Sequence, residues 1–378
     1  MSEGVASPRP FSLARVVAVI LAVDVVLLLL LEGAARLFLP ATEASRLGEL
    51  SRLTVELGLP ALQKVVLPDP LLFWKLRPGL PVTLIEGRIG PSDPIRFRLS
   101  TTAAGFRVPE PEGSPAVVCL GDSCTFGLGV EDGETFPARL QALTALSVLN
   151  AGVPGYSSFQ GRRLLEERIR TWRPQVVVIQ FGWNDAAVWD GRSDAEHAAL
   201  LARGPGLLLR SRLLQLLARL LPRQRSRSGE EASLPARPRL TPVEFGEELR
   251  AMIRLSRSES AAPLLVLWPA RHHLQGSRMA AHLDVLREVA ASDGVPLVDL
   301  VEVFSREGGS SLYADAVHAN PAGHRAVAEA IARTQRGSSH PPTRESNPVS
   351  SSAGASDRPA SPRPSETRSP PSSSSSDR

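Results

Sequence analysis

Cysteine and aromatic residues are scarce in this chain of 378 residues, which has two cysteines, two tyrosines and 5% Phe, Trp and Tyr together. Cys119 and Cys124 form no Cys-x-x-Cys pair, so neither a zinc ribbon nor a thioredoxin-like redox motif is supported. A disulfide between them would join an apolar strand to the turn that ends it, which is a poor geometry for the bond. The cysteines therefore do not indicate a compartment.

Sequence modules that bind phosphate, nucleic acid or metal are also missing. No Gly-Lys-Ser/Thr follows Gly121, and the spacing of Gly121, Gly127 and Gly129 does not match a dinucleotide fingerprint. The net charge is +4 and the pI about 9.6, but no basic segment is interleaved with aromatic residues. The seven histidines belong to no set with metal-ligand spacing. We expect no cofactor, no metal and no nucleic-acid partner, and the modest basic excess fits an anionic membrane surface.

A long apolar run lies near the N-terminus. Residues 16–31 are apolar except for Asp24, and extension of the run to residue 39 reaches the roughly 20 residues that a bilayer-spanning helix needs. Arg9 and Arg15 precede the run, as the positive-inside rule requires of a signal anchor.

We therefore expect residues 1–39 to form a short cytoplasmic N-terminus and a retained single-pass transmembrane helix, with the rest of the chain extracytoplasmic. Arg36, on the far side of the run, weakens the charge argument for this orientation. Two alternatives stay open: a signal peptide cleaved near Gly33-Ala34-Ala35, and a buried core helix.

After the apolar run the sequence changes character twice. Residues 40–66 have an amphipathic helical pattern and residues 67–111 resemble short strands punctuated by Pro and Gly, so we expect residues 40–114 to be a helical and β-rich lead-in. In residues 115–336 apolar runs alternate with helical stretches. The runs are residues 116–120, 147–150, 176–181, 263–268 and 296–300, and the helical stretches lie near 135–146, 158–171, 243–257, 277–292 and 321–334.

This alternation predicts an α/β domain with a parallel sheet, helices on both faces and a ligand site beyond the carboxyl ends of the strands. Residues 186–240 interrupt it as an insertion that contains a basic amphipathic helix over 206–222. A lid or membrane-interface helix fits that pattern, and so does an extra helix packed on the domain. Residues 337–378 are rich in Ser and Pro with almost no large apolar residues, so we expect a disordered tail.

Short motifs at the ends of the predicted strands carry groups that can do chemistry. Gly121-Asp122-Ser123 follows the first run, and a serine at the start of a helix lies near N–H groups that can stabilise an oxyanion. Gly155, in a glycine-rich loop after the second run, can present its N–H to a ligand because it has no side chain. Each of these motifs alone is equally typical of an ordinary turn.

Two further motifs follow later in the chain. Asn184 offers an amide donor after the third run, and Asp185 beside it can cap the next segment. Asp315 and His318 are three residues apart, so on one helical turn the carboxylate can fix the imidazole tautomer and stabilise its protonated form. A helix start capped by Asp315 or Asn320 would show the same residues. Together the four motifs supply a nucleophile, three donors, a base and the carboxylate that orients it.

Taken in this order, the motifs resemble the four blocks of the SGNH/GDSL hydrolase family over roughly residues 115–335. The lead-in segments DPLLFWKLRPG and TTAAGFRVPE are similar to those of membrane-anchored bacterial members. The resemblance implies a flavodoxin-like three-layer α/β/α fold. It also implies that Ser123 is the nucleophile, His318 the base and Asp315 its orienting carboxylate. The implied oxyanion donors are the N–H groups of Ser123 and Gly155 and the side chain of Asn184.

The resemblance predicts a serine esterase that forms an acyl-serine on ester substrates, such as O-acetylated carbohydrate or lipid, in the cell envelope. Alternatives are an envelope O-acyltransferase or polysaccharide deacetylase with the same intermediate, and a catalytically silent binding module. Cys124, next to the nucleophile, is expected to face the core, and Trp183 either lines the pocket or packs as core. The basic helix over 206–222 is a second candidate membrane contact.

Overall fold

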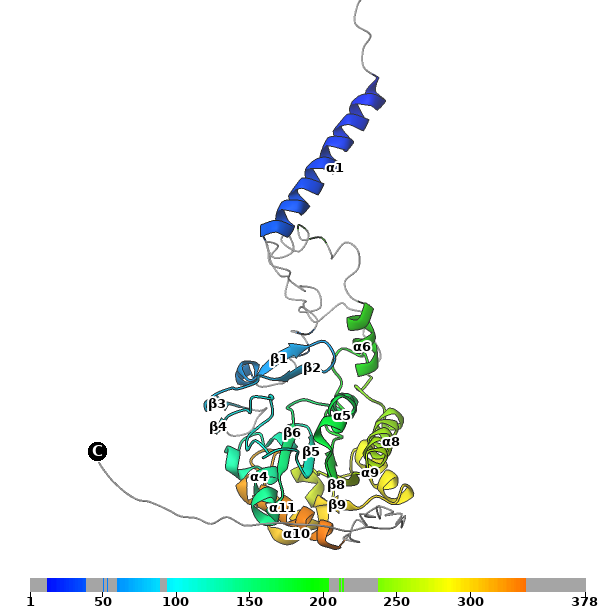
Figure 1. Ribbon diagram of the computed structural model, residues 1–378. Coiled ribbons are helices and arrows are strands. Elements are labelled where there is room, and N and C mark those ends of the chain that lie inside the picture. The colour runs from blue at the N-terminus through cyan, green and yellow to red at the C-terminus, as the bar shows by residue number, and fades with distance from the viewer. Residues whose placement is uncertain are drawn as a thin grey trace, which may run out of the picture. The chain divides into compact units, whose positions relative to one another are not determined.

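The computed structural model describes residues 12–38, 60–88, 94–203 and 237–337, together with residues 50, 53, 211 and 213. The chain divides into two units after residue 338, and the second unit lies outside the described residues. The first unit contains a five-stranded parallel sheet (Figure 1). Its strands are β5 (Val117–Gly121), β6 (Val148–Gly152), β7 (Val176–Gln180), β8 (Ala262–Leu267) and β9 (Leu297–Asp299).

The strands are arranged in the order β6-β5-β7-β8-β9, which is the flavodoxin-like order. The chain first adds β6 on one side of β5 and then continues on the other side with β7, so the direction of growth reverses at β5. Ligands of open α/β sheets bind beyond the carboxyl ends of the strands at such a reversal. The predicted parallel sheet is therefore confirmed, and each of the five apolar runs overlaps one strand.

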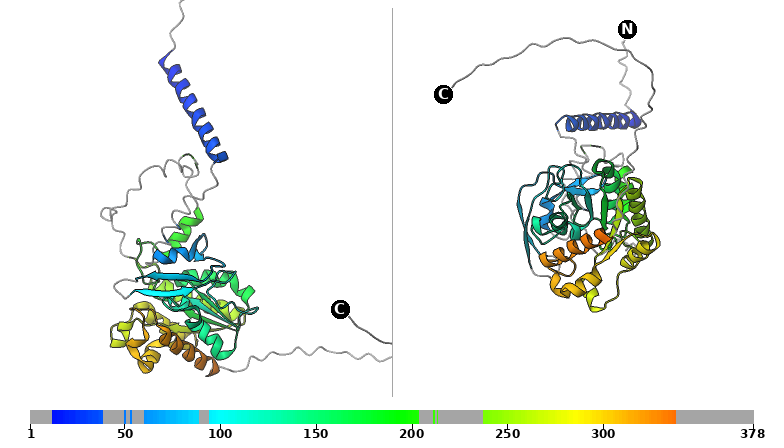
Figure 2. Two further views of the ribbon diagram at one scale, coloured as in Figure 1. Left: turned by 90° about the vertical axis from the view of Figure 1, so that its left-hand side faces the viewer. Right: turned by 60° about the horizontal axis from the view of Figure 1, so that its bottom comes forward.

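Successive residues of a strand point to opposite faces, and here they enter two separate hydrophobic cores. In β5, Val118 and Leu120 belong to one core, which we call the first core, whereas Val117 and Cys119 belong to the second. The first core is completed by α5 (Ser158–Trp172), α8 (Pro242–Ser258) and α9 (Ala281–Ser292), and the second by α4 (Phe136–Thr144), α10 (Leu300–Glu307) and α11 (Pro321–Gly337). The sheet thus separates two helical layers, seen from further sides in Figure 2.

All five predicted helices are confirmed, although α9 begins at Ala281 rather than near 277. The short helix α3 (Ser123–Phe126) is the helix start expected at Ser123. Among the described residues, the sequence pattern does not predict two further helices, α6 (Asp194–Arg203) and α10. The last of these divides the run 296–300 between a strand and a helix, because the Asp299 carboxylate caps α10 by accepting the N–H of Val301. The short 3-10 helices are η1 (Pro60–Lys64), η2 (Asp132–Glu134), η4 (Arg271–Gln275) and η5 (Gly309–Leu312).

The lead-in contains the predicted short strands as two antiparallel pairs. β1 (Val66–Asp69) pairs with β2 (Phe73–Leu76), and β3 (Thr83–Gly87) pairs with β4 (Ile95–Leu99). Trp74 of β2 and Phe97 of β4 are buried in the first core, so the lead-in packs into the sheet domain. The basic helix over 206–222, the tail from 338 onward and most of the amphipathic segment 40–66 lie outside the described residues. The domain boundaries at 39, 114 and 336 stay predictions.

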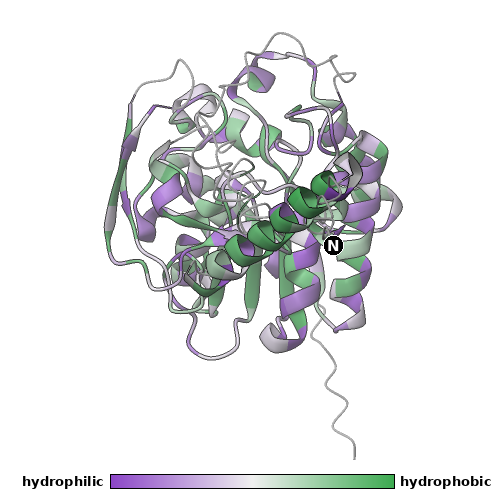
Figure 3. Cartoon of the chain, turned by 90° about the horizontal axis from the view of Figure 1, so that it is seen from above, coloured by the Kyte–Doolittle hydropathy of each residue, from purple (hydrophilic) through white to green (hydrophobic). Residues whose placement is uncertain are grey.

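Helix α1 (Leu13–Phe38) covers the predicted anchor and is apolar along most of its length (Figure 3). Within it, Arg15–Leu37 spans 23 residues and is long and apolar enough to cross a membrane, a criterion that a signal sequence also meets. None of its apolar window is buried in the described structure. This exposure argues against the alternative of a buried core helix.

Gly152, the last residue of β6, lies directly against the backbone of α3. A Cβ atom at this position would be 2.2 Å from the backbone nitrogen of Phe126. We expect Gly152→Ala to lower the free energy of unfolding by about 1–3 kcal/mol, because α3 must move away from the sheet. Thermal unfolding followed by circular dichroism measures this loss.

The matched control is Gly133→Ala in η2, where an added Cβ meets no atom within 4 Å. This variant should stay within about 0.5 kcal/mol of the wild type. Equal stability of the two variants would contradict the close approach of β6 and α3.

Candidate active site

Ser123 begins helix α3 directly after β5, at the carboxyl edge of the sheet. Asp122 is the N-cap of this helix, and its carboxylate accepts the N–H of Cys124 at 2.8 Å. The N–H of Ser123 donates to none of the described residues. A hydroxyl group and a free backbone donor therefore occur on the same residue.

His318 lies within hydrogen-bond distance of both Ser123 and Asp315. Its Nε2 is 2.8 Å from Ser123 Oγ, and its Nδ1 is 2.7 Å from Asp315 Oδ2. The other carboxylate oxygen of Asp315 accepts the backbone N–H groups of Val317 and His318, each at 2.7 Å. The fold thus joins a hydroxyl, an imidazole and a carboxylate in one hydrogen-bonded row.

Asp315 and His318 lie on a turn before α11, and the prediction of a shared helical turn is wrong. The helix begins only at Pro321, and Asn320 caps it by accepting the N–H groups of Ala322 and Gly323. Pro at the first helical position and Asn before it favour that start. The Asp315 carboxylate meanwhile binds the N–H groups that a helix would have used, which favours the turn.

Asp315 is 4% exposed. Burial raises the pKa of its carboxyl group, but the hydrogen bond and charge of His318 and the two backbone N–H groups lower the pKa by more. Asp315 is therefore ionised at neutral pH and can hold a proton on Nδ1 of His318. The side chain of His318 keeps 12% of its surface exposed, so the imidazole is not sealed from solvent.

Gly155 and Asn184 come to the same edge of the sheet from the loops after β6 and β7. Gly155 has a φ of +80°, and its N–H donates to none of the described residues. The Asn184 side-chain amide donates to the carbonyl of Tyr156 at 3.0 Å and lies 3.4 Å from Oδ2 of Asp122. The structure therefore gathers all the sequence-predicted site residues at the ends of β5, β6 and β7 and at the turn before α11.

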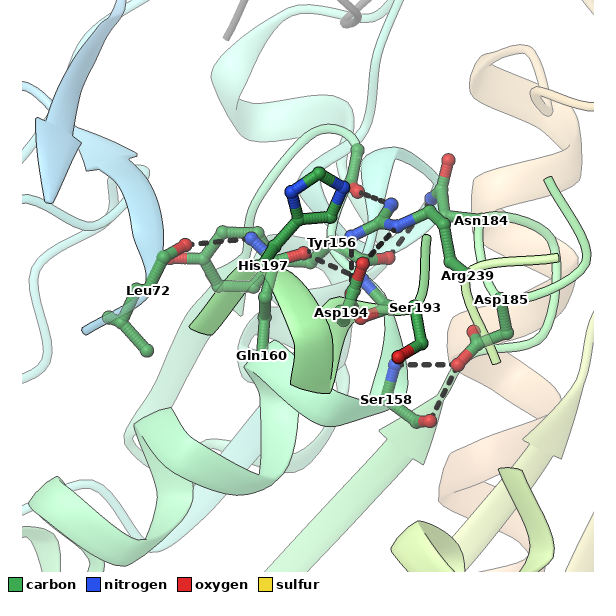
Figure 4. A network of polar contacts seen from close by, with 12 residues as sticks. Leu72, Tyr156, Ser158, Gln160, Asn184, Asp185, Ser193, Asp194, His197 and Arg239 are labelled. Carbon is green, nitrogen blue, oxygen red and sulfur yellow. Dashed lines mark hydrogen bonds and ion pairs between the residues drawn. The ribbon is translucent and has the colours of Figure 1, made fainter. Parts of the chain in front are cut away.

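Asp185, expected to cap the segment after it, instead caps α5 (Figure 4). Its Oδ1 accepts the N–H of Ser158 at 2.9 Å and the Ser158 hydroxyl, while Oδ2 accepts the N–H of Gly182 at 3.0 Å. This buried carboxylate thereby ties the end of β7 to the start of α5. It fixes the loop that carries Asn184.

Cys124 faces the second core, as predicted, and is 1% exposed. Burial raises the pKa of its thiol, so the group stays protonated and lacks the thiolate form that acts as a nucleophile. Trp183 packs against the first core, and its ring stacks on His273 with the ring centroids 5.6 Å apart. Its indole N–H donates to the carbonyl of Trp268 at 3.0 Å, and Trp183 stays partly exposed at the edge of this core.

Sequence reasoning missed a fully buried arginine of the lead-in, Arg107. Its guanidinium donates to the carbonyls of Phe126, Gly127 and Val130, at and just beyond the end of α3, and pairs with Asp132 at 2.8 Å. Burial lowers the pKa of Arg107, and Asp132 opposes that shift. The segment TTAAGFRVPE, which contains Arg107, was the available signal.

A second missed arginine is Arg239, near the end of the insertion over residues 186–240 (Figure 4). It pairs with Asp194 of α6 at 2.8 Å, and both side chains are fully buried. It also donates to the carbonyl of Gly155 and to Oε1 of Gln160, each at 2.6 Å. Nothing in the local sequence distinguishes Arg239 from the other arginines around it.

Asp122 gives this site a pH-dependent effect on stability. Burial raises the pKa of its carboxyl group from 3.8 to about 6, and the N–H of Cys124 opposes the shift. Between these two pH values the folded state holds a proton that the unfolded state has lost. The free energy of unfolding should therefore fall as pH rises through this range.

Denaturant unfolding of the wild type and of Asp122→Asn from pH 4 to pH 7 tests this effect. Asn keeps the cap but does not titrate, so the wild type should lose roughly 1–3 kcal/mol relative to the variant over that range. A difference that stays constant or grows with pH would show that the carboxyl group does not titrate as stated.

A known protein family matches the part of the chain that carries these residues. The model of the GDSL-like Lipase/Acylhydrolase family matches residues 119–326, more than half of the chain. No curated protein matches the chain.

Solved structures to which the chain is similar include a lipase/acylhydrolase from Enterococcus faecalis, which is 22% identical, with a TM-score of 0.39 over 58% of this chain and 95% of that chain. Another is a catalytic mutant of an acetylxylan esterase from Geobacillus stearothermophilus, which is 18% identical, with a TM-score of 0.37 over 60% and 96%. The family match itself covers the segment from β5 to α11 in which the site residues lie. The chain therefore belongs to the GDSL-like lipase/acylhydrolase family and is a serine hydrolase.

Proposed function

We propose that this protein is a membrane-anchored esterase that cleaves acyl esters through an acyl-serine intermediate. Ser123 is the nucleophile, His318 the general base and Asp315 the carboxylate that orients it. The oxyanion donors are the N–H groups of Ser123 and Gly155 and the side-chain amide of Asn184. The observation that carries the proposal is the unbroken row of contacts from Ser123 Oγ through both His318 nitrogens to the ionised Asp315.

In the first half-reaction, Nε2 of His318 accepts the proton of Ser123 Oγ while that oxygen forms a bond to the ester carbonyl carbon. The carbonyl oxygen becomes negatively charged, and the free N–H groups of Ser123 and Gly155 can donate to it and stabilise that charge. The intermediate then breaks its bond to the alcohol oxygen, which takes the proton from His318. Asp315 stabilises the imidazolium in between because its carboxylate contacts Nδ1.

In the second half-reaction, a water molecule replaces the alcohol. His318 accepts a proton from the water, whose oxygen attacks the acyl carbon and releases the acid. The proton returns to Ser123 Oγ as the acyl bond breaks, so the enzyme is regenerated. The overall reaction converts one ester and one water into an acid and an alcohol.

The proposed substrates are esters of the cell envelope, such as O-acetylated carbohydrate or lipid. This assignment is supported by helix α1, whose Arg15–Leu37 stretch has the length and composition of a membrane span. Arg9 before the span and Arg15 at its first position favour a cytoplasmic N-terminus and an extracytoplasmic catalytic domain. Cofactor and metal play no part in the proposed reaction.

Substitution of the two neighbouring candidate nucleophiles tests the assignment. Ser123→Ala should lose nearly all hydrolysis of acyl esters and acetylated sugars, a fall of about 10⁴-fold or more in kcat. Cys124→Ala should keep most of the activity, because that thiol is buried in the second core. Free acid release and labelling by a serine-reactive fluorophosphonate measure both variants.

An inactive Cys124→Ala beside an active Ser123→Ala would reverse the assignment of the nucleophile. Addition of an alcohol acceptor to the same assay separates hydrolysis from transfer. If only the new ester forms and no free acid is released, the activity is acyl transfer and the esterase proposal is wrong.

The anchor has its own test in the cell membrane fraction. The full chain should stay with the membranes after a high-salt wash, because burial of a 23-residue apolar helix does not depend on charge. A chain that begins after residue 39 serves as the control and should be released. Recovery of the full chain in the wash, or of a product shortened at residues 33–35, would contradict a retained anchor.

A further inference from the structure

Three consecutive carbonyl groups of the loop after β6 are each held by a different side chain. The indole N–H of Trp74 donates to the carbonyl of Pro154 at 3.0 Å. Arg239 donates to the carbonyl of Gly155 at 2.6 Å, and Asn184 to that of Tyr156 at 3.0 Å. The three donors come from β2, from the residues before α8 and from the loop after β7.

The first of these contacts controls the direction of a catalytic donor. The carbonyl of Pro154 and the N–H of Gly155 belong to the same peptide unit, and in a trans peptide they point in opposite directions. A hydrogen bond that pulls the carbonyl toward Trp74 therefore turns the N–H to the other side. On that side the N–H meets no described acceptor and is free for a ligand.

This peptide unit needs such a restraint because of Gly155. Its φ of +80° is accessible to glycine, but glycine has equal access to many other conformations. Without outside contacts the loop would divide its time among several peptide orientations. An oxyanion donor contributes fully only when it already points at the developing charge.

Trp74 is itself fixed on every side. It is fully buried, and its ring lies edge-on to Tyr156 with the centroids 6.0 Å apart. The Tyr156 hydroxyl donates back to the Trp74 carbonyl at 2.6 Å, so β2 and the loop bind each other in both directions. The ring also packs on Trp189 and lies 6.0 Å below the Arg239 guanidinium.

The backbone at Phe73, directly before Trp74, is strained. Phe73 has a φ of +66°, in the left-handed region that bulky residues avoid, and the N–H of Trp74 donates to the carbonyl of Leu72 at 2.8 Å. Together these features form a γ-turn of the rare, strained kind. The surrounding packing must offset a cost of roughly 1–3 kcal/mol.

We infer that Trp74 is a positioning residue for catalysis, which orients the N–H of Gly155 into the oxyanion hole through the carbonyl of Pro154. The inference rests on the proposed function in that Gly155 is taken as an oxyanion donor. It assigns the DPLLFWKL segment of the lead-in an indirect part in the reaction, through the loop after β6. Arg239 restrains the following peptide unit in the same way.

Trp74→Phe in the full chain tests this role, since it keeps an aromatic ring and removes the indole N–H. The kcat for an activated acyl ester should fall about 10–100-fold, somewhat less than the loss of a whole donor, with KM within about twofold. Replacement of Trp74 by 3-benzothienylalanine, which keeps the shape of indole without its N–H, should give the same loss if Phe impairs folding.

The matched control is Trp189→Phe, in the same aromatic cluster. Its indole N–H donates to none of the described residues, so kcat and KM should stay within about twofold of the wild type. A loss shared equally by Trp189→Phe and the Trp74 variants, or a change in KM alone, would overturn the inference.

Amide hydrogen exchange across residues 153–157 gives a readout that does not need substrate. It should speed up at least tenfold in the Trp74 variants and stay unchanged in Trp189→Phe, because only the former release the Pro154 carbonyl. If the wild type cleaves no ester, the proposed function fails, and exchange alone decides whether Trp74 holds the loop. Unchanged exchange in the Trp74 variants refutes the inference even in an active enzyme.

Discussion

The hydrogen bond between His318 Nε2 and Ser123 Oγ joins positions 195 residues apart in the chain. This 2.8 Å contact requires the backbone at the end of β5 and at the turn before α11 to be placed accurately relative to each other. Side chains alone do not supply that precision, because each has rotamer freedom. The sheet, the two cores and the caps of α3, α5 and α11 supply it by fixing the backbone on both sides of the bond.

Buried charged side chains hold much of this backbone in place. Arg107 holds the carbonyls that follow α3, and the ion pair of Arg239 and Asp194 holds the loop of Gly155. A guanidinium is suited to this task because its donors form a planar fork and it stays charged when buried. Loss of either arginine would leave buried carbonyls or a buried carboxylate without a partner, which costs several kcal/mol.

The lead-in is thus joined to the site at two points. Trp74 of β2 reaches the loop after β6, and Arg107 reaches the far end of α3. Both side chains are fully buried between the lead-in and the sheet. The segment between the anchor and the sheet therefore shapes the site as well as connecting the two.

The pattern of residues was enough to predict the parallel sheet and the succession of strands and helices, and to propose the residues of the candidate site. An unbroken apolar run such as residues 176–179 favours burial on both faces of a sheet. Cap residues such as Asn320 locate helix starts from local chemistry. The amphipathic segment 206–222 fits more than one arrangement, and its alternatives stay open. Local pattern also failed at Asp315, where the carboxylate stabilises a turn instead of the expected helix.

The hydrogen bonds that fix the backbone of the site became visible in the folded structure alone. Trp74, Arg107 and Arg239 all donate to backbone carbonyls. Because the carbonyl group has the same chemistry in every residue, the sequence does not indicate which carbonyl a side chain will bind. Cys124 was expected to face the core from the sequence, but the contact of Ser123 with His318 exists only in the folded chain. Residue type and spacing indicate which functional groups are available for catalysis. The orientation and burial of those groups exist only in the folded chain.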